Sequence, residues 1–167
     1  MKNVIIISGE KASGKTYEMV SYAVRSASHN NNVFIITEDA YSLKYFECII
    51  SEAYPLLRFE RKKDGFMFVD SLHNWFIYCV PFSNIHKYYY ELSLADEIMI
   101  DEYTTLTRLI KQENFVECTK KTTSVIVNIS DYYFYTGRFG VYDVIKKLGA
   151  NVIFKRVQKW LKKNSIH

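Results

Sequence analysis

Residues 9–16, with the sequence Gly-Glu-Lys-Ala-Ser-Gly-Lys-Thr, form a loop directly after an apolar run and directly before a helix-forming run. This loop fits the pattern GxxxxGK followed by Ser or Thr at every fixed position. Glycines let such a backbone curl, so that successive N–H groups point inward and can bind phosphate oxygens. A chain with this loop between a strand and a helix is expected to fold as an α/β protein.

The loop predicts a site for a nucleoside triphosphate, with ATP as the expected nucleotide, and for Mg²⁺. The Lys15 side chain is expected to reach the β- and γ-phosphate oxygens, and the Thr16 hydroxyl to ligate Mg²⁺. The predicted nucleotide-binding residues of the loop are Gly9, Glu10, Lys11, Ala12, Ser13, Gly14, Lys15 and Thr16. The alternative for this segment is a glycine-rich turn without a ligand.

Five short apolar runs are predicted to be strands. Each is nearly continuous rather than alternating, as expected for strands that are buried on both faces of a parallel sheet. They are residues 4–8, 33–37, 98–101, 124–129 and 151–157. The helix-like stretches between them are residues 15–27, 42–53, 104–112 and 141–148. This alternation predicts an α/β three-layer sandwich with a mostly parallel central sheet.

Residues 58–82 interrupt the alternation. They contain extended pieces at 66–69 and 75–80, separated by turn-like residues. These pieces predict an antiparallel hairpin or an extension at one edge of the sheet. Because the chain has only two prolines and no Pro- or Gly-rich linker, residues 1–167 are expected to form a single domain.

Two carboxylates, Asp101 and Glu102, stand at the end of the apolar run 98–101. In a parallel sheet the carboxyl ends of the strands face the ligand, so Asp101 is expected to hold Mg²⁺ through water. Glu102 is then placed to polarise the attacking water, since a general base must reach the reacting oxygen directly or through one water. Without the phosphate loop, the same pattern would be equally typical of a strand that ends in a turn.

Residues beyond the acidic pair supply further candidates. The run 124–129 ends in polar groups, and Asn128 and Ser130 are predicted to contact the γ-phosphate. The alternative is a strand that simply continues into a loop. Arg138 lies in a segment with two glycines and could reach a neighbouring subunit's site as an arginine finger. The alternative for this residue is an ordinary loop arginine.

Charge and cysteine content narrow the class of protein. The net charge of +4 is concentrated in residues 144–167, which predicts a solvated helix face, with a surface for nucleic acid or an acidic partner as the alternative. The three cysteines are far apart and odd in number, so they suggest neither a zinc pair nor a disulfide framework. No apolar run approaches the roughly 20 residues that span a bilayer. We therefore expect no membrane contact and a cytoplasmic location, in the host cytoplasm if the chain is viral.

The two motifs together resemble the P-loop NTPases of the additional-strand, catalytic-glutamate division. The run 33–37 lies between the motifs in the sequence, as an extra strand, and the acidic pair ends a later run. Within that division the layout resembles the ATPase domains of viral DNA-packaging motors, the terminase-like ATPases. Lys11 stands four residues before Lys15, where those enzymes commonly place a basic residue, usually arginine, that contacts the γ-phosphate. The run 124–129 with Ser130 looks like their coupling motif.

This resemblance implies a DNA-packaging or DNA-translocating motor that hydrolyses ATP with Mg²⁺. Its catalytic residues would be Glu102, Lys15, Lys11 and Arg138. The implied partners are double-stranded DNA and a capsid or nuclease protein. A homo-oligomer is implied as well, because an arginine finger has to come from a neighbouring subunit.

Two other classes of protein are compatible with the phosphate loop. Nucleoside kinases of the type II thymidine kinase kind have a similar size, a similar loop and an Asp-Glu pair after an apolar run. In those kinases a small residue, Gln and Phe follow the pair, whereas Tyr103, Thr104 and Thr105 follow it here, and the zinc cysteines are absent. The third class is a nucleotide-binding module without turnover.

Overall fold

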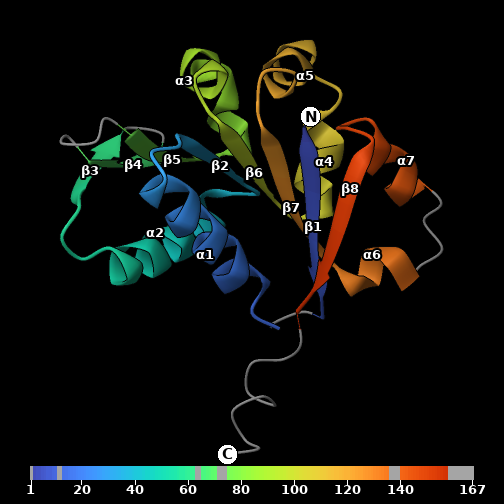
Figure 1. Cartoon of the computed structure of the whole chain (residues 1–167), viewed down its shortest axis with the longest axis horizontal. Coiled ribbons are helices and arrows are strands. Elements are labelled where there is room, and N and C mark those ends of the chain that lie inside the picture. The colour runs from blue at the N-terminus through green and yellow to red at the C-terminus, as the bar shows by residue number, and fades with distance from the viewer. Residues whose placement is uncertain (1, 11–12, 63–64, 71–74, 136–139, 158–167) are drawn as a thin grey trace, which may run out of the picture.

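The computed structural model describes residues 2–10, 13–62, 65–70, 75–135 and 140–157. Within these residues a single eight-stranded sheet runs in the order β3-β4-β5-β2-β6-β7-β1-β8 (Figure 1). The strands are β1 (Asn3–Gly9), β2 (Val33–Thr37), β3 (Arg58–Lys62), β4 (Gly65–Asp70), β5 (Trp75–Pro81), β6 (Glu97–Asp101), β7 (Ser124–Ser130) and β8 (Asn151–Arg156). The helices are α1 (Lys15–Ser28), α2 (Ala40–Ala53), the 3₁₀ helix η1 (Phe82–Lys87), α3 (Tyr89–Ser93), α4 (Tyr103–Leu109), α5 (Glu113–Thr119), α6 (Asp131–Tyr135) and α7 (Gly140–Lys146).

The sheet is mostly parallel. Six strands are parallel, and each pairs in parallel with its neighbour in the order β5, β2, β6, β7, β1 and β8. Strands β3 and β4 pair antiparallel with each other, and β4 pairs antiparallel with β5, so they extend one edge of the sheet. The predicted α/β sandwich with an antiparallel edge extension is therefore confirmed. The run predicted at 75–80 has a second role, because β5 also pairs in parallel with β2 and anchors the extension to the central strands.

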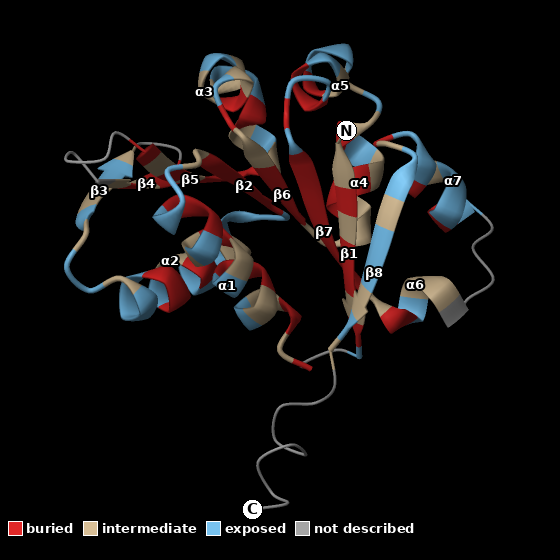
Figure 2. Ribbon diagram, in the orientation of Figure 1, coloured by how far each residue is buried: buried red, intermediate tan, exposed pale blue. Residues whose placement is uncertain are grey.

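Two apolar cores lie on opposite faces of the sheet. Met19, Val20 and Ala23 of α1 pack with Phe46 and Ile50 of α2 over one face. Helices α3, α4, α5 and α7 cover the other face (Figure 1). Figure 2 shows that the central strands β2, β6, β7 and β1 are largely buried, whereas β8 is largely exposed.

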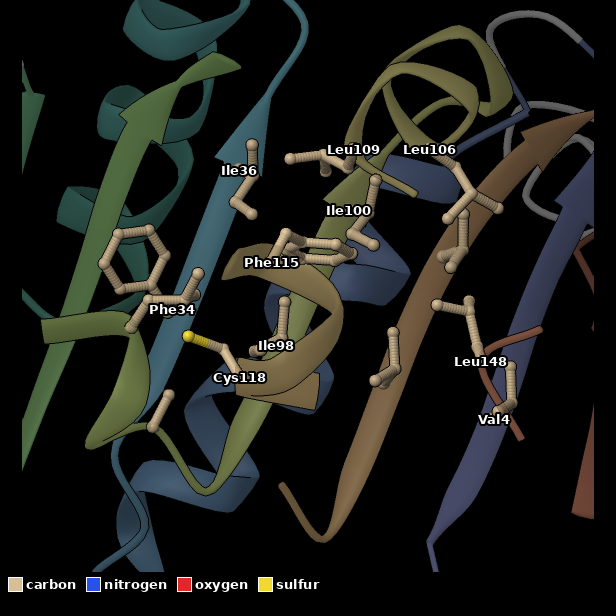
Figure 3. Packing of buried hydrophobic residues seen from close by; sticks show 14 of the residues in the cluster. Val4, Phe34, Ile36, Ile98, Ile100, Leu106, Leu109, Phe115, Cys118 and Leu148 are labelled. Atoms are coloured by element: carbon tan, nitrogen blue, oxygen red, sulfur yellow. The ribbon is translucent and has the colours of Figure 1, made fainter. Parts of the chain in front are cut away.

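The second core fills the space between the sheet and the shorter helices. Figure 3 shows Leu109 of α4 and Phe115 of α5 lying by Ile98 and Ile100 of β6, and Leu106 of α4 lying closer to β7. All five side chains are fully buried. This packing fixes α4, and with it the direction in which the chain leaves β6 after the acidic pair.

The predicted helix at 104–112 was wrong in extent. α4 ends at Leu109, and Gln112 is the residue from which a new helix, α5, begins. The sequence reasoning missed α5 and α3, because helices of seven and five residues are too short to show a clear 3.6-residue period. Each buries its apolar side chains against the sheet, so tertiary contacts stabilise helices that would be marginal alone.

The strand that separates the two sequence motifs in space is β7. The predicted extra strand at 33–37 is present as β2, but it lies on the far side of β6 from β1. Order along the chain does not fix order across a sheet, because crossovers can skip a position.

The basic region 144–167 is described only as far as residue 157. There Lys155 and Arg156 lie on β8, and they form ion pairs with Glu18 and Asp131. These two charges lie on the strand predicted at 151–157, whereas Lys146 and Lys147 are exposed at the end of α7. The prediction for the residues beyond 157 stays a prediction. Among the described residues, none of the helices combines the length and the apolar character that crossing a bilayer requires.

Candidate functional site

The phosphate loop and the acidic pair meet at the carboxyl ends of three neighbouring strands. β7 lies between β1 and β6, with Gly9 of β1 opposite Ser130 and Asp101 of β6 opposite Asn128. Parallel strands carry their carboxyl ends at one edge of the sheet, so residues that are distant in the sequence come together here. All of the sequence-predicted site residues that the structure describes lie at this edge.

The phosphate loop enters α1 at Gly14, whose φ of 97° is a backbone conformation that glycine adopts at little cost. The Ser13 N–H donates to the Glu10 carbonyl oxygen at 3.1 Å. The Lys15 ammonium donates to the same oxygen at 2.9 Å, and only 8% of this residue is exposed. The ammonium is therefore held within the curve of the loop. Lys11 and Ala12 lie outside the described residues.

Gly9→Ala is expected to disrupt the loop. An added Cβ would lie 2.5 Å from the Ser13 Oγ and 2.8 Å from the Val157 carbonyl oxygen, and the second of these is backbone that cannot rotate away. Overpacking of this kind costs about 1–3 kcal/mol, so we expect ATP affinity to fall about tenfold or more in calorimetric titration. Gly140→Ala is the matched control, because its Cβ would meet only the Tyr103 hydroxyl at 3.9 Å. Equal affinities in the two variants would contradict the tight packing at Gly9.

Glu102 has an unusual backbone conformation for a residue other than glycine, with φ 77° and ψ 152°. Its N–H donates to the Asn128 Oδ1 at 2.6 Å, and its carboxylate accepts from the Ser130 N–H at 3.0 Å. Such conformations persist where surrounding interactions over-determine them. Both interactions come from β7, so this strand sets the direction of the Glu102 carboxylate.

Asn128 connects the two members of the acidic pair. Only 1% of the residue is exposed. Its side-chain oxygen accepts the Glu102 N–H, and its side chain also hydrogen-bonds the Asp101 carboxylate. Ser130 binds the Glu102 carboxylate in turn. The predicted contacts of Asn128 and Ser130 with a γ-phosphate stay a prediction, and the bonds described here orient the carboxylates.

Burial changes the pKa of each of the three charged groups at this edge. Burial, together with the nearby charges of Glu102 and Glu38, raises the pKa of Asp101 to about 6, although a hydrogen bond with Asn128 opposes this change. Burial also raises the pKa of Glu102, although the charge of Lys15 opposes this change. Burial lowers the pKa of Lys15, and the charges of Glu102, Asp131 and Asp101 oppose this. Because burial disfavours the charged form of both carboxyl groups, a cation bound beside them would stabilise that form.

Asp101→Asn is expected to stabilise the nucleotide-free protein at neutral pH. The carboxyl pKa is about 6 in the folded chain against an ordinary value of 3.8, so the folded state binds the proton more tightly and stability falls as pH rises from 4 to 6. Above that window the ionised carboxyl costs at most about 3 kcal/mol. We expect a higher urea midpoint for the variant at pH 7.5, with a difference that shrinks toward pH 4. A lower midpoint at pH 7.5 would contradict the direction of the pKa change.

The residues present fit a nucleoside triphosphate with Mg²⁺. The Ser13 Oγ is buried without a hydrogen-bond partner among the described residues, as an atom awaiting a ligand would be. The Thr16 hydroxyl and the Asp101 carboxylate are hard oxygen donors of the kind that Mg²⁺ takes. In phosphate-transfer sites Mg²⁺ uses one or two carboxylates together with phosphate oxygens and waters.

Sequence reasoning missed three residues beside the site. Glu38 directly follows β2 and accepts a hydrogen bond from the Thr104 hydroxyl at 3.1 Å. Asp131 directly follows β7 and accepts two hydrogen bonds from the Arg156 guanidinium, both at 2.7 Å. The strand-end rule that selected the acidic pair could have found both carboxylates, whereas nothing in the sequence indicates the arginine. The predicted finger residue Arg138 lies outside the described residues.

No protein-family model matches this sequence, and no curated protein matches it. Solved structures do match it. The large terminase of a thermophilic bacteriophage matches with a TM-score of 0.61 and 13% identity, over 92% of this chain and 40% of that chain. The ATPase domain of the large terminase of Thermus phage P74-26 matches with a TM-score of 0.57 and 12% identity, over 98% of this chain and 80% of that chain. The N-terminal domain of the DNA packaging ATPase of bacteriophage phi29 matches with a TM-score of 0.51 and 12% identity, over 94% of this chain and 91% of that chain.

These matches show the fold. The chain has the α/β fold of phage terminase and packaging ATPase domains, and it spans 40% of the length of the first terminase. That terminase has also been solved in complex with ADP, in a form that matches with a TM-score of 0.51. The resemblance predicted from the sequence is therefore confirmed at the level of the fold.

Proposed function

We propose that this chain binds ATP with Mg²⁺ in the phosphate loop and hydrolyses it. The observation that carries the proposal is the position of Glu102. Glu102 follows Asp101 directly, and its carboxylate accepts a hydrogen bond from the Ser130 N–H at 3.0 Å. Ser130 lies opposite Gly9, the first residue of the phosphate loop. A carboxylate held there can take a proton from a water that attacks the γ-phosphate.

The other site residues have complementary tasks in this proposal. The Lys15 ammonium would leave the Glu10 carbonyl oxygen and bind phosphate oxygens, while the backbone N–H groups of the loop surround the β-phosphate. The Thr16 hydroxyl and, through water, the Asp101 carboxylate would hold Mg²⁺, which supplies positive charge at the phosphates. Asn128 would keep the two carboxylates in a fixed relation to each other.

We infer further that ATP hydrolysis moves double-stranded DNA, in packaging or in a related translocation. The support is the shared fold with phage large terminases and with the phi29 DNA packaging ATPase. An oligomer of this chain, acting with a capsid or nuclease protein, follows from the same inference.

The test is release of phosphate from ATP by the purified protein with Mg²⁺, measured alone, with linear double-stranded DNA and with thymidine. Stimulation by DNA is the expected result. Transfer of phosphate to thymidine would instead favour a nucleoside kinase. Tight ATP binding without turnover would favour a binding module, and either of these outcomes would contradict the proposal.

A further inference from the structure

An ion pair crosses the end of strand β1 at the base of the phosphate loop. β1 lies between β7 and β8, with Gly9 opposite Ser130 and Ser8 opposite Arg156 (Figure 1). Asp131 follows Ser130 directly, and both of its carboxylate oxygens accept hydrogen bonds from the Arg156 guanidinium at 2.7 Å. The pair therefore joins the two strands that flank β1, at the residues where β1 becomes the loop.

The geometry of this pair is well defined. A guanidinium that donates two parallel hydrogen bonds to one carboxylate fixes the orientation of both groups. Asp131 is 6% exposed, whereas the Arg156 side chain is 52% exposed. Loss of one partner from a pair that is buried on one side leaves the buried charge without compensation. The position of Asp131 should therefore depend on Arg156.

The position of Asp131 in turn fixes a hydrogen bond of the site. No loop separates β7 from α6, because Ser130 ends the strand and Asp131 begins the helix. The Ser130 N–H is the group that donates to the Glu102 carboxylate at 3.0 Å. A displacement of Asp131 would thus move the donor that holds Glu102.

We propose that Asp131 and Arg156 are positioning residues, which keep the Ser130 N–H and the Glu102 carboxylate in place beside the phosphate loop. The effect on turnover rests on the ATPase function proposed above. Neither residue has to touch the nucleotide. The pair acts across β1 to set where the general base stands relative to the loop.

The test compares Asp131→Asn, Arg156→Gln and the double variant with the wild type. One substitution removes a negative charge and the other a positive charge, so a purely electrostatic effect on ATP binding would have opposite signs. Loss of positioning instead lowers kcat in both, by about 10- to 100-fold, while KM for ATP moves no more than about threefold. The double variant should be no slower than the slower single variant, because the two residues act as one unit.

A second measurement does not depend on hydrolysis. Exchange of the Ser130 amide hydrogen, followed by NMR in the nucleotide-free protein, should become about tenfold faster or more in both single variants. Glu117→Gln is the control, since it breaks an exposed 2.8 Å ion pair between Glu117 of α5 and Lys120, which follows the helix, and should change neither readout. The Arg156 side chain is half exposed, so its variant carries the test if Asp131→Asn does not fold.

Two results would overturn the inference. One is wild-type exchange at Ser130 in Arg156→Gln, and the other is losses of kcat that add in the double variant. A wild-type protein without ATPase activity would refute the proposed function instead. Exchange of the Ser130 amide hydrogen would then be the only test of whether the ion pair positions Ser130.

Discussion

Glu102→Gln is expected to bind ATP with wild-type affinity and to lose at least about 100-fold in kcat. Glutamine keeps the size of the side chain, and its carbonyl oxygen can still accept the Ser130 N–H that now holds the carboxylate. Glutamine cannot take a proton from water, so only the rate of the chemical step should fall. Calorimetric titration with ATP and Mg²⁺ measures the affinity, and single-turnover release of phosphate measures the step.

Glu97→Gln is the matched control for this variant. Glu97 begins the strand whose last residue is Asp101, and burial raises the pKa of its carboxyl as it does for Glu102. Neutralising it changes a partly buried carboxylate at the opposite end of β6, so turnover should stay at the wild-type rate. Wild-type turnover in Glu102→Gln itself would remove Glu102 from the role of general base.

Lys15→Ala is expected to lose at least about 100-fold in ATP affinity, because each hydrogen bond between charged groups contributes about 1.5–3 kcal/mol. The ammonium is already desolvated inside the loop, as the lowered pKa of Lys15 and its bond to the Glu10 carbonyl oxygen indicate. Much of the free-energy cost of desolvating this charge is therefore already included in the folded, nucleotide-free state. Calorimetric titration of the variant at fixed Mg²⁺ concentration provides the measurement.

Lys121→Ala removes an exposed lysine just beyond the end of α5 and serves as the comparison for overall charge. Its affinity for ATP should equal that of the wild type. Should Lys15→Ala bind ATP as tightly as Lys121→Ala, the assignment of residues 9–16 as a phosphate loop would be refuted.

The features that local sequence determines were predictable. The run 33–37 is apolar up to its last residue, Thr37, and forms β2 with the same bounds, since a strand buried on both faces needs no alternating polar positions. The strand, loop and helix around residues 9–16 follow from one motif. The acidic pair could be placed at the edge of the sheet because the carboxyl ends of parallel strands lie together.

The features that depend on contacts between distant segments were not predictable. The strand order places β7 between β1 and β6, and no local pattern records which neighbour a strand selects. The partners Asp131 and Arg156 are 25 residues apart and meet only because β1 aligns β7 with β8. The positive φ of Glu102 is a further example, because the bonds from Asn128 and Ser130 that support it arise only in the folded sheet.

The insertion of β7 also sets a spacing that the proposed hydrolysis would require. Neighbouring strands lie about 4.8 Å apart, so β1 and β6 are separated by about 10 Å. In the proposed reaction, that width would leave room for a terminal phosphate and, behind it, a water molecule in line with the bond to be broken. If β6 stood directly beside β1, its carboxylates would occupy the volume that the proposed nucleophile needs.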